Sequence, residues 1–555
     1  MCLYGTKLAE EERPVDRLSE LLGHHVQFSY TALDRIVLNG YIERLQRPEN
    51  LVYFFHDVAG VACIEPAVLS QRTDRYKARV RSYTEDRQVP VLRAPKGARK
   101  EDLVLPYYRQ VAGSEGVACV LTSMEQGRTF VSYTPRFAPT SGDPNYRLIK
   151  ACRKQFLHYY FYVLDPVMGP MSLRVATYFP FNVTCYLNGH SFIAQELTRQ
   201  GIAFQKEDNA FLNVADVAAL QAAADRLSPD ILRERCDYWT EQLTPRFSDR
   251  ERELVHSAYR YSIAQIELAT DVIFKRAAPL KALFHRAVDI GLLLGGADQA
   301  THLFGRRIDR RYKGKLQTVL DRRNEGQPVL RSYYQTSFAK LYVRSYRLLR
   351  AETCINNTYH LGIGRRLENL PALTERMAIT NQRYLDLQAE LLESTVDTGK
   401  LAELTQPTMV GSRRIPGIKL HDDRVIRLMD ALLHPGGFVA DWTSRDVHTR
   451  VLERHQLTEI DYRLSQLRYD LTKLRAKGLV ERIGKTRRYR VTALGLKLGV
   501  LLVKARTRLL GPLCTLATTE RRRVPTRNPS AVEAAMRRLD ADLNTLCQTL
   551  GLIAA

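Results

Sequence analysis

The amino-acid sequence predicts an α+β protein of several domains, with an N-terminal α/β part, a central hairpin and helical region, and a C-terminal unit of three helices and a basic hairpin. Its 555 residues exceed what one hydrophobic core usually supports. Strand-like and helix-like periods alternate along most of the chain, whereas the C-terminal unit begins with helical periods alone. Positive charge is concentrated in that last unit, which sets it apart from the rest.

The composition argues against several classes of protein. Hydrophobic residues make up 45% of the chain and charged residues 26%, as in ordinary globular proteins. No apolar run reaches eighteen residues, so neither a membrane helix nor a membrane partner is predicted. The acidic N-terminal segment lacks the apolar core of a signal peptide. The nine cysteines are scattered without a CxxC pair, which argues against a zinc knuckle and favours a reducing cytoplasm.

The charge points to a polyanionic partner. The net charge is +23 and the isoelectric point is near 9.6. Residues 405–527 contain 26 Lys and Arg against 11 Asp and Glu, an excess of 15. This short region therefore carries most of the excess charge, and we expect it to bind nucleic acid.

Turn-forming segments and changes of periodicity divide the chain. The segment "APTSGDPNYR" marks one boundary, and "VGSRRIPGIKLHDD" leads into the C-terminal unit. Residues 248–276 follow the helical period after a capping box formed by Ser248 and Glu251. No internal repeat is visible. The predicted domains are an α/β domain (1–145), a hairpin-containing α/β domain (146–227), a mostly helical domain with an inserted strand pair (228–404), the C-terminal unit (405–510), and a basic tail with a terminal helix (511–555).

The C-terminal unit has the order helix, helix, helix, strand, turn, strand. Its third helix opens at Thr458 and carries leucines on one face at the helical period. The stretch "LRAKGLVERIGKTRRYRVTALG" then gives a helix end, a glycine stop and a basic hairpin. Residues 420–505 thus resemble the winged helix-turn-helix of MarR-type and ArsR-type bacterial regulators. This resemblance implies a fold that binds duplex DNA.

In such a fold the third helix would lie in the major groove and the wing against phosphates or the minor groove. A winged helix used for protein contact is the alternative, but the clustered charge favours DNA. On the helix, Tyr462 and Tyr469 are also expected on the outer face. The predicted nucleic-acid-binding residues here are Arg463, Gln466, Arg468 and Lys473 of the helix and Lys485, Arg487, Arg488 and Arg490 of the wing.

A second candidate lies in the hairpin predicted from Leu157–Leu164 and Ser172–Phe181. In a strand, His158, Tyr160 and Tyr162 share one face, and Arg174 follows on the returning strand. Aromatic side chains beside an arginine suit the stacking of a single strand. An ordinary hairpin core explains the same residues and is the favoured interpretation.

The same stretch also offers two candidate catalytic residues, His158 and Tyr160. Rolling-circle initiators and relaxases use two histidines on one strand with a tyrosine nucleophile. Only His158 is available here, because Tyr160 stands where the second histidine would be, and His190 is the nearest other candidate.

The fragment "FAKLYVRSYRLLRAE" resembles the K-x-Y-x-K and L-R-x-E motifs of phage and plasmid replication proteins. Lys340, Tyr342, Arg350 and Glu352 match these motifs, and Arg344 replaces the second lysine. The resemblance implies a functional tyrosine. Between two cations, the phenolate of Tyr342 is expected to be stabilised or to lie beside a bound phosphate. Lys340 and Arg344 are accordingly predicted to bind nucleic acid.

A divalent metal is the only cofactor predicted. Asp34 and Glu125 each follow a strand-like run, where nuclease metal ligands commonly lie, and Asp208 is a third candidate. Each could equally be a turn or cap residue. No Walker loop, GxGxxG, HExxH or GxSxG motif occurs, so ATP hydrolysis, dinucleotide redox chemistry and serine hydrolysis are not supported.

The whole chain, through "DRIVLNGYI", "HYYFY" and "LRAETCIN", also resembles a family of large bacterial proteins that occur in several copies per genome. This resemblance implies a mobile-element context without an assigned activity. The sequence therefore predicts a nucleic-acid-binding protein that grips duplex DNA and handles a single strand, as a replication initiator, relaxase or transposase-like factor does. A non-enzymatic DNA-binding regulator and a protein that recognises structured RNA are the alternatives.

Overall fold

A computed structural model describes the chain over residues 18, 23–95, 100–111, 115–135, 147–255, 258–281, 318–324, 327–334, 336–392, 403–420, 422–433, 442–484, 486–506, 538, 541, 542 and 545. The chain has a mixed α+β fold, as the sequence predicts. It divides into two compact units. The first comprises Met1–Phe284 and Thr301–Asp386, and the second comprises His285–Ala300 and Leu387–Ala555. Among the described residues, no helix has the length and apolar character needed to cross a membrane.

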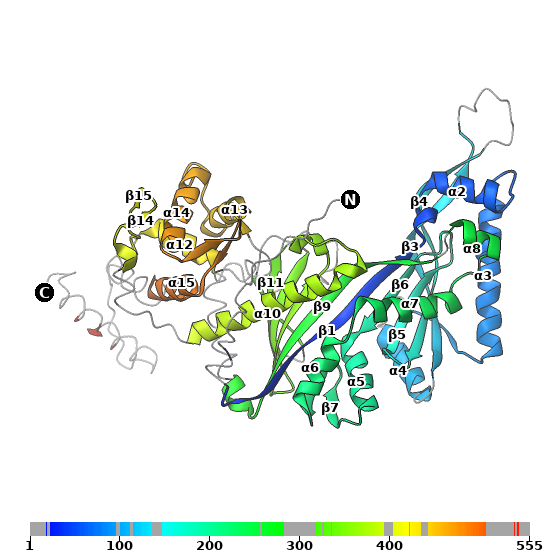
Figure 1. The fold of residues 1–555 in the computed structure, drawn as a ribbon, viewed down its shortest axis with the longest axis horizontal. Helices are drawn as coiled ribbons and strands as arrows, with labels where there is room; N and C mark the ends of the chain where they lie inside the picture. The colour runs from blue at the N-terminus through cyan, green and yellow to red at the C-terminus, as the bar shows by residue number, and fades with distance from the viewer. Residues whose placement is uncertain are drawn as a thin grey trace, which may run out of the picture. The chain divides into compact units, whose positions relative to one another are not determined.

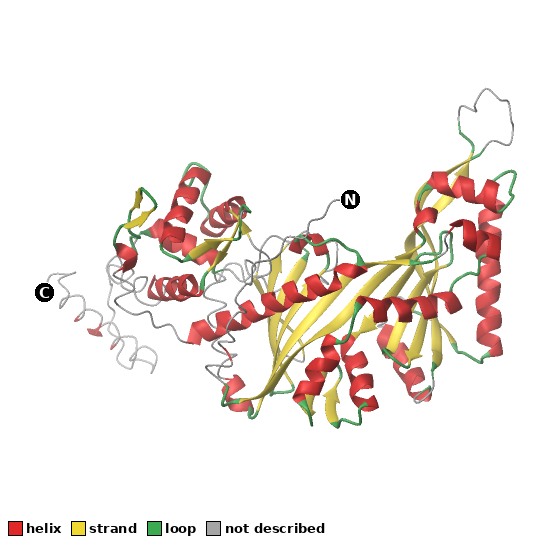
Figure 2. Ribbon diagram, in the orientation of Figure 1, coloured by secondary structure: helices red, strands yellow, loops and turns green. Residues whose placement is uncertain are grey.

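The first unit is built on an eleven-stranded sheet (Figures 1 and 2). The strand order is β10-β11-β12-β13-β9-β1-β6-β5-β4-β3-β2. The strands are β1 (Val26–Tyr41), β2 (Val91–Arg93), β3 (Gly116–Tyr133), β4 (Leu148–Asp165), β5 (Gly169–Ala176), β6 (Val183–Asn188), β9 (Arg260–Phe274), β10 (Thr318–Asn324), β11 (Gln327–Tyr334), β12 (Ser337–Arg344) and β13 (Leu348–Ile355).

The sheet repeats one topology twice. β1 is followed, after an excursion, by the antiparallel meander β3–β6, whose last strand returns to pair with β1. β9 is followed in the same way by the meander β10–β13, whose last strand returns to pair with β9. β1 and β9 pair antiparallel and join the halves. The repetition lies in strand order, which explains why no repeat of residues is visible in the sequence.

The helical prediction for residues 248–276 is wrong over its second half. Ser248 and Glu251 do form the expected capping box, which begins α8 (Asp249–Val255). Arg260–Phe274, however, is strand β9. Its last seven residues are all buried, so the two-residue alternation of buried and exposed positions that marks a half-solvated strand is absent there. Because strands from all three predicted N-terminal domains pair in one sheet, the boundaries predicted at 145 and 227 fall inside a single unit.

Helices cover both faces of the sheet (Figure 1). Thr270 and Asp271 are consecutive in β9 and therefore point to opposite faces. Thr270 accepts a hydrogen bond from Asn381 of α10, whereas Asp271 lies beside His190 of α5. The helices of this unit are α2 (Pro48–Tyr53), α3 (Pro66–Asp86), α4 (Lys100–Gln110), α5 (Gly189–Arg199), α6 (Val217–Asp225), α7 (Pro229–Leu243), α8 and α10 (Leu370–Leu392), with a separate hairpin of β7 (Phe204–Glu207) and β8 (Ala210–Val214).

The predicted hairpin is confirmed as β4–β5. Within residues 228–404, where the sequence predicts an inserted strand pair, the described residues form β9 to β13, and α10 follows β13. The segment "GHSFIAQELTRQG" contains α5, whose N-terminus is capped by the Asn188 side chain.

The second unit has the element order and sheet expected of a winged helix. Its three-stranded sheet has the order β16-β18-β17, and its core includes Trp442, Leu467 and Leu471. The elements are β14 (Thr408–Val410), β15 (Arg413–Ile415), α12 (Asp423–Leu432), β16 (Trp442–Thr443), α13 (Ser444–His455), α14 (Leu464–Ala476), β17 (Val480–Arg482), β18 (Arg488–Val491) and α15 (Ala493–Ala505). The third helix begins at Leu464 rather than at the predicted Thr458.

Candidate functional site

A buried ionic cluster lies on the face of the sheet covered by α5. Strand register places its members there, because directly opposed residues in antiparallel strands share a face. Asp271 is opposite Tyr30 of β1 on one side and Arg350 of β13 on the other, and Arg350 is opposite Tyr342 of β12. Lys340 and Glu352 are opposed in the same way.

A β-bulge in β1 adds Asp34 to this cluster. The pairing passes from Leu33 with Leu268 to Ile36 with Ile266, so Asp34 and Arg35 together oppose the single residue Glu267. Bulges of this kind re-aim side chains and are common beside functional sites. Here the bulge places one buried carboxylate and one exposed guanidinium next to Glu267.

Three carboxylates meet at the bulge. Oxygen atoms of Asp34, Glu267 and Glu352 lie within 4.8 Å of one another. Burial alone would raise the pKa of Asp34, but contacts with His190, Arg350 and Asn209 hold that pKa well below its usual range. Burial likewise opposes ionisation of Glu352, but Lys340 lowers its pKa.

Glu267 behaves differently from its two neighbours. Burial and the adjacent Glu352 raise the pKa of Glu267 to about 7, against the opposing effect of Lys340. The cluster can therefore hold a proton near neutral pH in place of a third full negative charge.

His190 is brought to the cluster by a close backbone approach. A Cβ atom at Gly189, the first residue of α5, would lie 2.0 Å from the Leu33 carbonyl oxygen, so only glycine allows this helix to begin against β1. His190 is fully buried, with Nδ1 3.3 Å from Asp34 Oδ1 and Nε2 3.9 Å from Asp271 Oδ2. Among the described residues, neither ring nitrogen has a well-formed hydrogen bond.

Arg350 organises the other side of the cluster. It is fully buried and donates from Nε to Asp271 Oδ1 (2.6 Å) and from Nη2 to Asp271 Oδ2 (2.7 Å). Its Nη1 lies 3.6 Å from Asp34 Oδ2 and, within the described part of the chain, makes no hydrogen bond. Tyr30 donates to the same Asp271 carboxylate at 2.6 Å.

The donor set fits a divalent cation. When ionised, the carboxylates of Asp34, Glu267, Asp271 and Glu352 exceed the cations Lys340 and Arg350 by two charges. Three carboxylates suit Mg²⁺ or Mn²⁺, and an imidazole nitrogen favours Mn²⁺ over Mg²⁺. Buried polar atoms normally have partners, and a cation would supply one for His190. Asp34, Glu267 and Glu352 are thus the residues that could hold a metal, and His190 lies beside Asp34.

The predicted phenolate of Tyr342 is contradicted. Its hydroxyl donates to Glu352 Oε2 at 2.8 Å, and Lys340 Nζ contacts the other oxygen of the same carboxylate at 2.5 Å. Burial and Glu352 raise the pKa of Tyr342 far more than the nearby cations lower it. Arg344 turns away to bond Asn209 and Asp208. Lys340 and Arg344 are thus engaged within the unit.

Glu125, the other carboxylate suggested as a metal ligand, lies outside the carboxylate cluster found among the described residues. It accepts hydrogen bonds from Lys100 (2.7 Å), Tyr160 (2.7 Å) and Arg174 (3.3 Å). Burial would raise the pKa of Glu125, but these donors lower it to about 2. Glu125 therefore joins α4 to β4 and β5 as a structural ion pair.

The two other predicted catalytic residues belong to this second cluster. His158 is buried and stacks on Phe156, and burial and Arg174 lower its pKa. Burial raises the pKa of Tyr160, whose ring is contacted by Lys100 Nζ 3.6 Å from its centroid. Neither residue belongs to the group that could hold a metal. The favoured interpretation of the hairpin as packed core agrees with this arrangement.

Three of the eight predicted nucleic-acid-binding residues of the second unit are exposed. Arg463 and Arg468 are exposed at α14, and Arg487 is exposed in the wing. Gln466 is half-buried and caps the helix by accepting from the Arg463 amide. Arg488 is half-buried, and Lys485 lies outside the described residues.

Lys473 and Arg490, two further residues predicted to bind nucleic acid, have intramolecular contacts. Lys473 lies over the Tyr469 ring at 4.6 Å, and Arg490 pairs with Glu481. The prediction that Tyr462 faces outward is wrong, because the helix begins only at Leu464. The Tyr462 side chain is buried and donates to Asp470.

Sequence reasoning missed Glu267 and Asp271. Both lie on β9, for which the sequence predicts a helix, so their position on one face of a strand, four residues apart, was not considered. The two acidic residues of the otherwise mostly apolar segment "QIELATD" were the available signal. Comparison with protein-family models, curated proteins and solved structures found no match for this chain.

Proposed function

We propose that this protein processes nucleic-acid strands, with metal-assisted phosphodiester chemistry at the carboxylate cluster of the first unit and duplex DNA binding by the second. The observation that carries the proposal is the meeting of the three carboxylates of Asp34, Glu267 and Glu352, with the buried imidazole of His190 3.3 Å from Asp34. Buried clusters with an uncompensated charge of this kind favour catalytic sites over packing, because unpaired carboxylates are costly to bury. A cytoplasmic location is proposed with it, since the scattered cysteines suit a reducing compartment.

The residues around the cluster have distinct proposed roles. A bound divalent metal would polarise a phosphoryl oxygen and stabilise the charge that develops on it. Arg35, exposed beside the cluster and without a partner among the described residues, would contact a backbone phosphate. Tyr342, whose hydroxyl donates to Glu352, would help to orient that carboxylate. Lys340 holds Glu352 in place.

The second unit supports the choice of substrate. Arg463, Arg468 and Arg487 are exposed on the helix and wing that a winged helix directs at duplex DNA. The affinity of the second unit for duplex DNA should fall steeply as the salt concentration rises, because each contact with a phosphate releases counterions from the DNA.

A non-enzymatic DNA-binding regulator is the second candidate. It is favoured by one observation: Lys340 and Arg350 already neutralise part of the cluster, so the same residues could serve to hold β12, β13 and β9 together. Binding of metal separates these candidates, because a purely structural cluster has no need of a cation.

The first experiment measures Mn²⁺ binding by calorimetry and Mn²⁺-dependent cleavage of single-stranded DNA. We expect Glu352→Gln and Asp34→Asn to weaken Mn²⁺ binding at least tenfold, and Glu125→Gln to leave it unchanged. Cleavage should be lost in Glu352→Gln and in Asp34→Asn, and retained in Tyr160→Phe and in Tyr346→Phe, whose side chain is 76% exposed. Cleavage without metal, or undiminished in Glu352→Gln, would refute the assignment.

A second experiment identifies the nucleic acid that copurifies with the full chain at low and moderate salt. Short DNA with recurring ends supports strand processing. A defined RNA that survives the salt wash would instead favour the RNA-binding alternative.

A further inference from the structure

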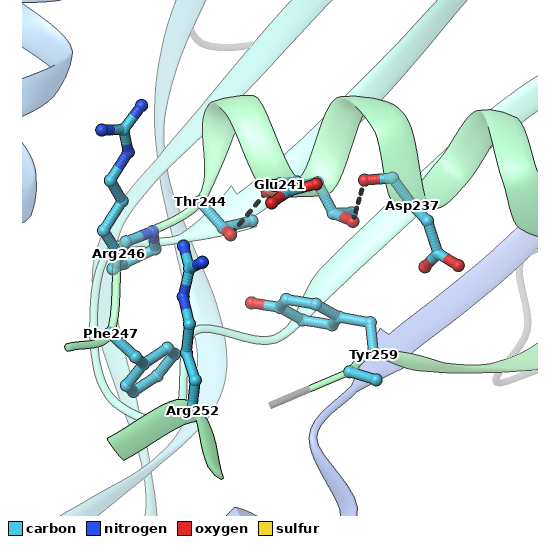
Figure 3. Close-up of a pocket in the computed structure, with 10 residues that line it drawn as sticks. Asp237, Glu241, Thr244, Arg246, Phe247, Arg252 and Tyr259 are labelled. Atoms are coloured by element: carbon cyan, nitrogen blue, oxygen red, sulfur yellow. Dashed lines mark hydrogen bonds between the residues drawn. The ribbon is translucent and has the colours of Figure 1, made fainter. Parts of the chain in front are cut away.

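A pocket of about 300 Å³ opens between the end of α7, α8 and the start of β9 (Figure 3). The pocket lies on the face of the sheet that α7 covers, opposite the face covered by α5. Cys236 of α7 contacts Cys185 of β6, whereas the next residue, Tyr186, points to the α5 face because side chains alternate along a strand. The pocket is thus separate from the carboxylate cluster. Its lining residues are Asp237, Thr240, Glu241, Thr244, Pro245, Arg246, Phe247, Arg252, Ala258 and Tyr259.

The negative end of α7 is already neutralised. A helix C-terminus leaves carbonyl oxygens unpaired and carries partial negative charge. Here Arg79 of α3 donates to the carbonyls of Thr244 (2.5 Å) and Gln242 (2.7 Å), and Tyr76 donates to that of Leu243 (2.7 Å). Three carbonyls at this helix end are therefore already occupied by donors from α3.

Two of those arginines are left without an anion. Arg246 and Arg252 are exposed, and neither has an ion pair among the residues that the structure describes. Arg252 extends from α8 toward the end of α7, between Phe247 and Tyr259 (Figure 3). Burial and then the charges of Arg246 and Arg252 lower the pKa of Arg79. An anion would relieve their mutual repulsion.

The remaining walls offer flat apolar surface and acceptors. The Phe247 ring packs edge-on against Phe54, with centroids 6.2 Å apart, and Tyr259 donates to the Phe181 carbonyl at 2.9 Å, so both rings are fixed. Asp237 and Glu241 lie on the α7 side, where the Asp237 carboxylate accepts from Tyr261 at 2.9 Å. Donors, aromatic faces and acceptors thus line one cavity.

We propose that this pocket binds a nucleoside phosphate. Arginine pairs suit phosphate oxygens, a fixed aromatic ring suits a nucleobase face, and carboxylates accept from sugar hydroxyls or base amino groups. The volume lies at the lower end for ligand sites, which suits one nucleotide rather than a dinucleotide. The same chemistry is offered by a free nucleotide and by the phosphorylated end of a strand.

The test is calorimetric titration of the full chain with deoxyadenosine 5′-monophosphate, with deoxyadenosine and inorganic phosphate as partial probes. The nucleotide should bind at least tenfold more tightly than either part. Arg252→Ala and Arg246→Ala should each weaken its binding at least fivefold. Phe247→Leu should weaken binding of the nucleotide but not of phosphate. Arg250→Ala is the matched control, because Arg250 is exposed on the same helix and does not line the pocket.

Two further arms identify the source of the ligand. Tighter binding of a 5′-phosphorylated oligonucleotide than of its unphosphorylated form, lost in Arg252→Ala, assigns the pocket to a strand end. Equal binding of both oligonucleotides, with tight binding of the mononucleotide, assigns it to a free nucleotide. The proposal is overturned if the nucleotide does not bind at millimolar concentration, or if Arg250→Ala reduces binding as much as Arg252→Ala in variants of unchanged thermal stability. Loss of strand cleavage in the cluster variants leaves these results unaffected.

Discussion

Replacing Glu125 by glutamine should destabilise the first unit in a pH-dependent way. The carboxylate has a pKa of about 2 in the folded chain against an ordinary value of 4.5. A difference of about 2.5 units corresponds to roughly 3 kcal/mol of stabilisation. The Glu125 side chain is 24% exposed, and screening by solvent reduces this figure, so we expect a loss of about 1–2 kcal/mol at pH 7.

The sign of the pH dependence follows from the direction of the shift. A carboxyl group with a depressed folded-state pKa stabilises the fold above its unfolded pKa, and this contribution is lost as the pH falls through the folded value. The difference between Glu125→Gln and the parent should therefore be full above pH 5 and shrink from about pH 4.5 toward pH 2. Glutamine matches the protonated acid in shape and charge, which makes the comparison direct.

The assay is urea denaturation followed by tryptophan fluorescence. The chain has two tryptophans, and Trp239 is buried in the first unit while Trp442 belongs to the second. A Trp442→Phe background therefore reports the first unit alone. Glu253→Gln, which removes an exposed carboxylate, is the matched control and should change stability by less than about 0.5 kcal/mol. A pH-independent difference, or one that grows as the pH falls, would refute the reasoning.

Three other outcomes are expected. Arg350→Met should destabilise the first unit by about 3–5 kcal/mol, because it leaves Asp271 buried without its bidentate partner; a loss below about 1 kcal/mol in the same fluorescence assay would contradict this. Asn381→Leu should cost about 2–3 kcal/mol, since three buried hydrogen bonds to Thr353, Leu268 and Thr270 lose their partner, and thermal unfolding would reveal the change. Arg487→Ala should lower the slope of log K against log salt for duplex DNA by about 1, and an unchanged slope would remove the wing from the interface.

Local signals in the sequence predicted much of the secondary structure. The hairpin β4–β5 was predictable because Pro and Gly stand where the chain reverses, and α8 because Ser248 and Glu251 form a capping box. The helices and the hairpin of the second unit were also predicted from local signals, namely leucines at the helical period and a glycine that ends the third helix. Such features depend on neighbours within a few residues, so they need no knowledge of the fold.

The candidate site was predictable only in part. Asp34, Lys340, Tyr342, Arg350 and Glu352 were singled out from their sequence context, but as two unrelated groups. Glu125 was a separate metal-ligand candidate, and the structure places it in an ion pair with Lys100 and Arg174. The sequence around a carboxylate that follows a strand does not show whether a lysine or arginine on a neighbouring element forms an ion pair with it or whether it is free to bind a metal.

The sequence by itself determined the fold class, the basic C-terminal unit and the polar residues of β12 and β13. Only the tertiary structure decided that β1, β9, β12 and β13 are neighbours and that α5 brings His190 to Asp34. The physical reason is the length scale of the interactions. Helical periods, caps and turns act over a few residues, whereas the pairing of β1 with β9 joins residues more than two hundred positions apart. Because β9 is buried on both faces near its end, the alternation that would have revealed it is absent.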